Sequence, residues 1–158
     1  LAQHLAEQLT RFPFALLIAF IFFILNPKSF WIPSMFTMII ALFSTFLSFL
    51  IQFLMQSIIA TLCFWTEKAS SIEKLIFIPT LFLSGLLAPV ESFPNYVKSW
   101  IYLTPFPYLI NFPANVLSGN ASNITSGIFI QIIWVILFFY IFIKAWKSGT
   151  KKYTAMGS

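Results

Sequence analysis

The chain has 158 residues, of which 59% are hydrophobic, 20% are aromatic and only 8% are charged, and its net charge is +5. A soluble domain carries about 25% charged residues, because much of its surface faces water. The composition therefore excludes a soluble globule, a disordered chain and a nucleic-acid-binding module. It predicts an integral membrane protein whose basic residues, placed at the ends of apolar stretches, serve membrane topology rather than nucleic-acid binding.

The apolar stretches predict the number of membrane spans. A helix needs about 20 residues to cross a hydrocarbon core of about 30 Å. We expect an all-α fold: a single polytopic transmembrane helical bundle over residues 1–158, with four spans and short external re-entrant helices between the third and the fourth. The expected segments are a cytoplasmic leader helix at 1–11, spans at 12–27, 33–64, 72–90 and 126–146, and an external re-entrant segment at 91–125.

The second and third spans differ in the residues that interrupt helices. From Ser29 to Thr66 there is no charge, and after Pro33 there is no Gly, Pro or Asn, so one long, tilted helix is expected rather than a hairpin. The third span contains Pro79, Gly85 and Pro89. A straight helix does not persist through three such residues, and we expect it to break near Ser84-Gly85.

The external segment is too apolar for a solvated loop and too rich in proline for one helix. Pro94 is expected to start a short helix that ends at Leu103, and Pro113 a second that ends at Gly119. Backbone that is not helical at membrane depth must be buried in protein, so this segment should pack against partners. A fifth full span is the weaker alternative, because the prolines are closely spaced.

The orientation follows from the basic residues. Four spans with a cytoplasmic C-terminus leave seven of the nine Lys and Arg side chains inside, and only Lys28 and Lys98 outside. This distribution satisfies the positive-inside rule and predicts an integral protein of a bacterial inner membrane. The lysines near the C-terminus, such as Lys147, are expected to contact anionic lipid headgroups.

The residues that catalysis requires are largely missing. The sequence has no Asp, one His and one Cys, and the apolar stretches within the spans, such as 75–90 and 127–143, carry no charged residue. It has neither a phosphate-binding loop motif nor a nucleophile elbow. The chain is therefore predicted not to be an enzyme, and to hold no metal site and no cofactor of its own.

A stripe of small and polar residues follows one face of the second span. Ser44, Ser48, Gln52 and Gln56 lie within a sector of about 120° at 100° per residue. Small and polar side chains favour contacts between helices in lipid. The stripe is thus an interior face, either a helix–helix or dimer interface or the lining of a substrate path.

Two further groups of residues are candidates for functional contacts. His4, Glu7 and Arg11 share one face of the leader, which is either solvated or a docking surface. Around the expected helix break, Glu91 either caps a helix or lines an exit. The candidate residues for the helix break and an external gate are Ser84, Gly85, Pro89 and Glu91.

A series of short motifs resembles the second half of type-2 ATP-binding-cassette permeases, and more narrowly a bacterial subgroup of small six-helix permeases. Their order and spacing carry the resemblance, which covers almost the whole chain. The motifs are Phe64-Trp65, LFLSGLLAPV at 81–90, Phe93-Pro94, Leu103-Thr104-Pro105-Phe106, Phe112-Pro113, Leu117-Ser118-Gly119 and GTKKY at 149–153.

The resemblance implies a function that the residues alone do not give. The four spans would be the family's helices three to six, and the chain would form the C-terminal portion of a permease. Such a permease would dimerise and export its substrate with energy from ATP and Mg on a separate ATP-binding cassette subunit. His4, Glu7 and Arg11 would then dock that subunit. The alternative is a membrane assembly or anchoring protein that does not transport.

Overall fold

A computed structural model of the chain describes residues 33–66, 69–121 and 123–156, and a few residues before them. The chain divides into two compact units, Leu1–Ile32 and Pro33–Ser158. The leader helix and most of the expected 12–27 span lie outside the described residues. Those that are described in the first unit are helical: Pro13, Phe14, Leu17, Phe20, Ile21, Ile24 and Leu25.

In the second unit every regular element of the described residues is a helix, which confirms the all-α prediction. Helix α2 runs over Met35–Thr61 and continues as the 3-10 turn η2 over Leu62–Phe64. It begins where Ser34 Oγ accepts a hydrogen bond of 3.2 Å from the backbone N–H of Thr37. Together they form one uninterrupted apolar stretch of 30 residues, long enough to cross a membrane. The predicted single long helix is therefore observed, and no hairpin interrupts it.

Helix α3 covers Ala69–Leu83 and is shorter than the expected 72–90 span. It tolerates Pro79 in its interior but ends directly before Ser84-Gly85. Gly85 adopts a φ of 87°, a left-handed conformation that stops the helix and that other residues rarely adopt. At 1.5 Å per residue, α3 is about 22 Å long, which is less than the hydrocarbon core requires.

Four short elements follow α3. They are η3 (Val90–Ser92), α4 (Asn95–Ile101), η4 (Phe106–Tyr108) and α5 (Asn111–Leu117). Helix α4 starts after Pro94 as predicted, but α5 starts two residues before Pro113, where the expectation was wrong. Proline is accepted in a first helical turn, because the N–H groups there have no partner within the helix.

Helix α6 covers Ile124–Met156 and continues ten residues beyond the expected end at 146. Its last part holds several lysines and Gly149, none of which ends it. Gly149 is buried, and a Cβ atom there would collide with the Phe64 ring, so the glycine lets α6 pack closely on η2. The stretch Ile124–Lys151 is the second described helix long and apolar enough to cross a membrane.

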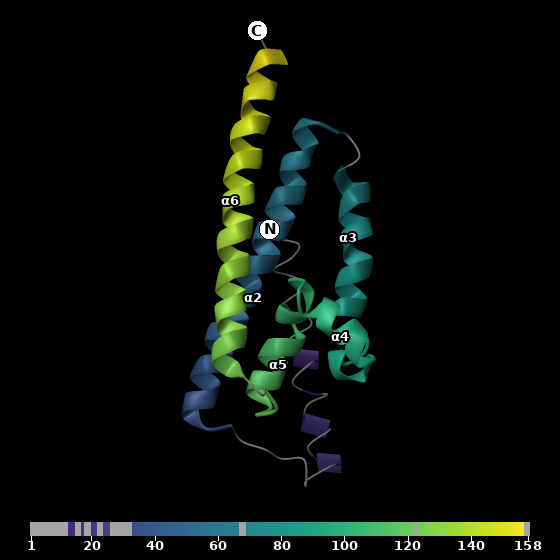
Figure 1. The fold of residues 1–158 in the computed structure, drawn as a ribbon, viewed down its shortest axis with the longest axis vertical. Coiled ribbons are helices and arrows are strands. Elements are labelled where there is room, and N and C mark those ends of the chain that lie inside the picture. Colours follow the sequence, from purple (N-terminus) through teal and green to yellow (C-terminus); the bar gives the residue numbers. More distant parts are fainter. Residues whose placement is uncertain are drawn as a thin grey trace. The chain divides into compact units, whose positions relative to one another are not determined.

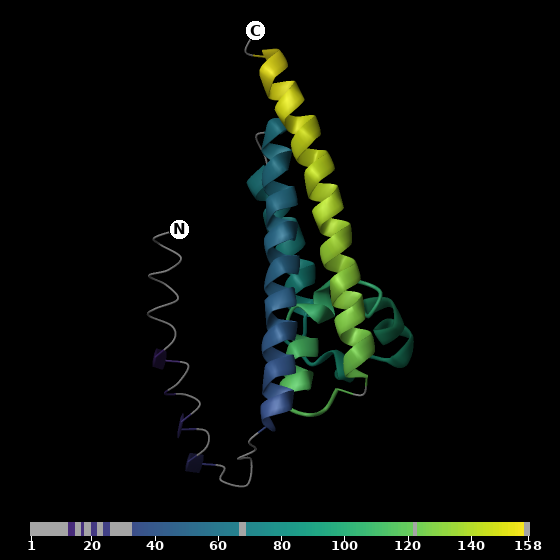
Figure 2. The same cartoon turned by 90° about the vertical axis from the view of Figure 1, so that its left-hand side faces the viewer.

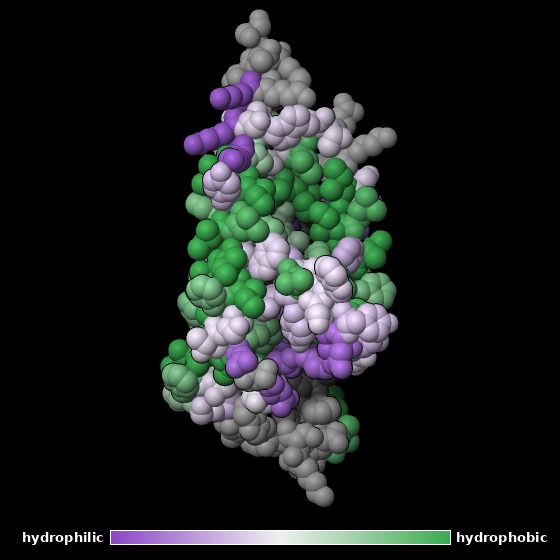
Figure 3. Space-filling model, viewed as in Figure 1, coloured by the Kyte–Doolittle hydropathy of each residue, from purple (hydrophilic) through white to green (hydrophobic). Residues whose placement is uncertain are grey.

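Helix α2 is the central element of this unit. In both views α6 lies alongside it, and α3 returns on another side of it (Figure 1; Figure 2). Helix α5 packs against the half of α2 that is nearer Met35. The buried core joins α2, η4 and α5, and partly buried side chains of α6 pack against it. Its residues are Ala41, Ile51, Tyr108, Leu109, Phe112 and Val116. A largely hydrophobic belt separates polar groups near the C-terminal end of α6 from polar groups of the segment between α3 and α6 (Figure 3).

Candidate functional site

A buried polar network of the described residues centres on Gln131 of α6, which is fully buried. Its Oε1 accepts a hydrogen bond of 3.0 Å from Ser44 Oγ. Its Nε2 lies 3.0 Å from Ser48 Oγ, 3.0 Å from the Tyr108 carbonyl oxygen and 3.1 Å from the Ser44 carbonyl oxygen. Two amide hydrogens serve these three acceptors, so Gln131 uses its full donor capacity. The network joins α6, α2 and η4.

Ser48 makes the second link between α2 and η4. Its hydroxyl is 2.7 Å from the Tyr108 carbonyl oxygen and 2.9 Å from the Ser44 carbonyl oxygen. Ser48 is the fourteenth of the 30 residues in Met35–Phe64, about 20 Å along the helix from Met35. The turn at η4 is therefore attached to the middle of α2 and not to its end.

The predicted polar stripe on α2 divides into two parts. Ser44 and Ser48 are buried in the network around Gln131. Gln52 and Gln56 have exposed side chains and line a groove of about 80 Å³ between α2 and α3. The other polar residues of this groove are Glu73 and Thr80 of α3, and Leu109 lies at its wall.

A larger cavity, of about 380 Å³, opens among the short elements beside the start of α6. Glu91 lines it, and its Oε1 accepts hydrogen bonds from Asn115 Nδ2 at 2.7 Å and Asn111 Nδ2 at 3.1 Å, with the Tyr102 hydroxyl at 3.5 Å. Burial raises the pKa of Glu91. Hydrogen bonds from Asn111, its own backbone, Asn115 and Tyr102 stabilise the ionised carboxylate and together lower the pKa by more than burial raises it. The pKa of Glu91 is therefore lowered, and the carboxylate is ionised at neutral pH.

The helix break and Glu91 meet at Asn111. The Asn111 N–H donates a hydrogen bond of 2.9 Å to the Ser84 carbonyl oxygen. A Cβ atom on Gly85 would lie 2.9 Å from both Cβ and Oδ1 of Asn111, so only glycine fits there. Ser84 is fully buried, and its Oγ has no hydrogen-bond partner among the described residues. Of the four residues predicted for this region, Pro89 is exposed and directly precedes η3.

Several residues of the site were not predicted. Gln131 carried a usable signal, because it is the clearly polar residue within an otherwise apolar span and needs buried partners. No sequence signal indicated Asn111, Asn115 or the Tyr108 carbonyl. Only the fold brings the two asparagines to Glu91 and the carbonyl to Ser48. His4, Glu7 and Arg11 lie outside the described residues. In the part of the chain that is described, no group of three or more His, Cys, Asp and Glu residues could hold a metal ion.

These features define a helical membrane protein in which a Pro-rich segment folds back onto a long apolar helix. A family model described as ABC-2 family transporter protein matches residues 7–157. The chain therefore belongs to the ABC-2 transporter family, which confirms the resemblance to type-2 ATP-binding-cassette permeases. Comparison with curated proteins and comparison with solved structures gave no significant match.

Proposed function

We propose that this chain is the membrane-spanning permease subunit of an ATP-driven exporter and forms the substrate path as a dimer. Membership of the ABC-2 family across residues 7–157 supports the permease role. We propose that ATP and Mg are bound by a separate ATP-binding cassette subunit, and the lack of a phosphate-binding loop in residues 1–158 is consistent with this division. The leader residues His4, Glu7 and Arg11 are the candidates for docking that subunit.

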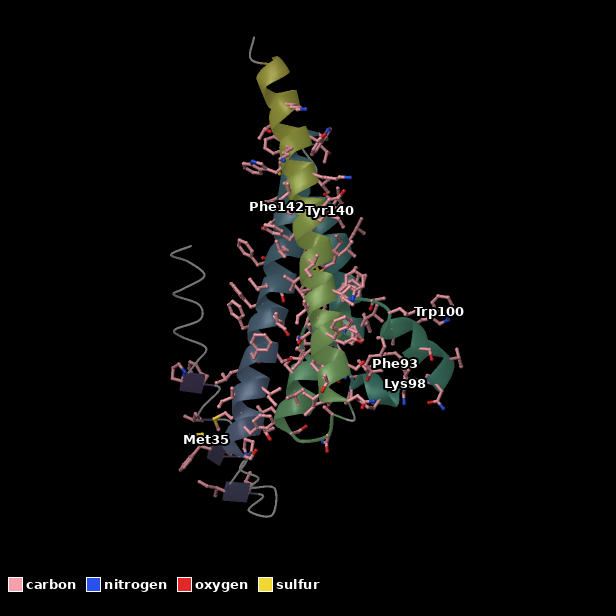
Figure 4. The ribbon with its side chains drawn as sticks, turned by 60° about the vertical axis from the view of Figure 1, so that its left-hand side comes forward. Met35, Phe93, Lys98, Trp100, Tyr140 and Phe142 are labelled. Atoms are coloured by element: carbon pink, nitrogen blue, oxygen red, sulfur yellow. The ribbon has the colours of Figure 1, made fainter. Side chains whose placement is uncertain are left out.

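The proposed topology has four spans, with the first at 12–27 and the third formed by α3 and the residues after its break. The C-terminus faces the cytoplasm of a bacterium, and the chain lies in the inner membrane. Lys144 and Lys147 support this orientation, because they flank Trp146, whose ring centroid lies 5.8 Å from that of Phe64, so they lie at the η2 end of the bundle. The opposite end bears Trp100, which points away from α2 and α6 (Figure 4), as expected of an aromatic side chain at the membrane–water boundary.

The observation that carries the proposal is the attachment of Tyr108 to the middle of α2. If Met35–Phe64 crosses the membrane, then the segment between α3 and α6 is re-entrant, because η4 reaches the depth of Ser48. Backbone that is not helical at this depth is tolerated only when its polar groups are satisfied within the protein. Ser48 and Gln131 both bond the Tyr108 carbonyl, which meets that condition.

The turn at η4 also separates the groove between α2 and α3 from the cavity beside Glu91. Leu109 lines the groove beside Gln52 and Gln56, and the neighbouring Tyr108 lines the cavity that holds Glu91. We propose that the groove and the cavity are the inner and outer parts of one path, with the turn as its closed gate. Transport then requires a second packing of the turn against α2, driven by the ATP-binding subunit.

The test is purification of the full-length protein from native membranes in mild detergent, with ATP hydrolysis assayed in the eluate. A stoichiometric ATP-binding subunit, with hydrolysis that vanadate inhibits and added lipid or cargo changes, is the expected result. A matched purification of a variant with His4, Glu7 and Arg11 replaced by Ala should retain the permease and lose most of the partner. An eluate without a nucleotide-binding partner, even after crosslinking in the membrane, would overturn the proposal and favour an assembly or anchoring protein.

A further inference from the structure

The cavity beside Glu91 combines a negative charge with aromatic rings. Its polar lining consists of Glu91, Asn111, Asn115, Asn120, Asn123 and Ser126. Three rings form another part of its wall. Tyr102 and Tyr108 meet edge to face with centroids 6.5 Å apart, and the centroids of Tyr108 and Phe112 are 5.8 Å apart.

The carboxylate of Glu91 has neutral partners only. Asn111, Asn115 and Tyr102 donate to its Oε1, and no cationic side chain of the described residues acts on it. Three donors fix the position of the carboxylate and favour its ionised form without neutralising its charge. The charge is thus held in place at the wall of a cavity large enough for a small organic group.

The chemistry of this lining excludes several classes of ligand. The negative charge of Glu91 would repel an anion. A purely apolar group would leave the asparagine amides without hydrogen-bond partners. A hard divalent cation requires several oxygen ligands, but two amides direct their nitrogen atoms toward the single carboxylate. A carboxylate beside aromatic rings is suited to an organic ammonium group, which the faces of the rings also attract.

We propose that this cavity binds the ammonium group of a small organic cation, with Glu91 as its counter-ion. Tyr102, Tyr108 and Phe112 contact its alkyl or methyl groups. Asn120, Asn123 and Ser126 at the rim bond the polar remainder of the molecule. The ammonium group belongs either to a soluble cation or to a lipid headgroup. This binding does not depend on transport, so its failure would leave the permease proposal intact.

The test measures binding of choline to the purified full-length protein in detergent by equilibrium dialysis. Dimethylbutanol, the neutral carbon isostere of choline, serves as the competitor that matches its shape without its charge. We expect choline to bind, dimethylbutanol to compete poorly, and Glu91→Gln to weaken choline binding about tenfold. Glutamine keeps an oxygen that can accept from Asn111 and Asn115, so this variant removes the charge and preserves the shape of the wall.

A second variant keeps the proposal testable if Glu91→Gln does not fold. Asn123 lines the cavity and directly precedes the first residue of α6, where an aspartate is well tolerated. Asn123→Asp adds a second negative charge and should tighten choline binding about threefold or more. Choline binding that is unchanged in both variants, or equal competition by dimethylbutanol, would overturn the proposal.

Nanodiscs distinguish the two sources of the ammonium group. In discs of phosphatidylglycerol alone, wild-type protein should bind choline as it does in detergent. If the natural occupant is a lipid headgroup, inclusion of phosphatidylethanolamine will weaken choline binding. If it is a soluble cation, the lipid will have no effect. Both results support a cation site, whereas absence of choline binding in every disc and in detergent would contradict it.

Discussion

The side-chain amide of Gln131 in α6 donates to the backbone carbonyl of Tyr108 in η4 across 3.0 Å, in a position where Gln131 is fully buried. Together with the bond that Ser48 of α2 donates to the same carbonyl, it connects the single 3-10 turn η4 to two long apolar helices. In surroundings of low dielectric constant such a shared acceptor is held firmly, and an unmade bond is costly. One amide of α6 and one hydroxyl of α2 therefore help to fix the position of the turn.

Replacement of Gln131 by Leu should destabilise the bundle. The variant removes every bond of the amide and leaves the Ser44 hydroxyl without the Oε1 acceptor. Polar contacts between membrane helices contribute about 1–2 kcal/mol in model systems, so we expect the free energy of unfolding to fall by about 2 kcal/mol. Unfolding in detergent, followed by circular dichroism, measures it. Ile133→Leu, at an exposed site two residues away, is the control, and an equal stability of both variants would contradict the role of Gln131.

Gly127 should not accept a side chain while Phe112 keeps its position. A Cβ atom at Gly127 would overlap the Phe112 ring, which belongs to the buried core. Overpacking of this kind costs about 1–3 kcal/mol, and we expect Gly127→Ala to lower the unfolding temperature accordingly. Phe112→Leu in the same chain should restore part of the loss. Ser126→Ala, next to it and exposed, should leave the unfolding temperature unchanged.

Gly85→Ala tests the helix break. An alanine there must adopt a φ of 87° and must approach Asn111 to within 2.9 Å, so we expect a loss of about 2 kcal/mol in the free energy of unfolding. Gly119→Ala is the matched control, because the exposed Gly119 also has a positive φ, of 74°. The difference between the two variants reports the contact with Asn111. Equal losses would show that this contact contributes nothing.

The two parts of the polar stripe should respond differently to substitution. Ser48→Ala should lower the free energy of unfolding by about 1 kcal/mol, because Ser48 is buried and bonds the Tyr108 carbonyl. Gln52→Leu with Gln56→Leu should change it by less than about 0.5 kcal/mol, because both side chains are exposed in the groove. The double variant should instead reduce hydrolysis of ATP by the purified complex. Full activity of that complex would remove Gln52 and Gln56 from the proposed path.

The proposed orientation can be checked by labelling. Cysteine placed at Lys147 near the end of α6 should react with an impermeant thiol reagent only after the cells are opened. Cysteine placed at Lys98 of α4 should react in intact cells, because α4 lies at the opposite end of the bundle. Cys63 is exposed and must first be replaced by Ser. Labelling of Lys147→Cys in intact cells would contradict a cytoplasmic C-terminus.

The sequence was informative where one local property decides the structure. Absence of any breaker after Pro33 predicts the long helix α2, and Gly85 predicts the end of α3. The end of α6 was misplaced, because the lysines that mark a membrane boundary do not interrupt a helix. Contacts between distant residues could not be derived in this way. Ser44, Ser48, Gln52 and Gln56 were predicted to form one interior face. The separation of the buried serines from the exposed glutamines depends on which neighbouring helix each pair meets.

The central claim is that the turn at η4 lies at the depth of the middle of α2. Spin labels at Ile110, beside this turn, and at Phe49 of α2 occupy exposed positions, and Tyr96 of α4 provides an exposed reference at the outer end. Power-saturation measurements with oxygen and a water-soluble nickel complex, on the full-length protein in nanodiscs, give the depth of each label. The account predicts that the label at Ile110 lies at the same depth in the bilayer as the label at Phe49, and deeper than the label at Tyr96. A label at Ile110 as shallow as one at Tyr96 would contradict it.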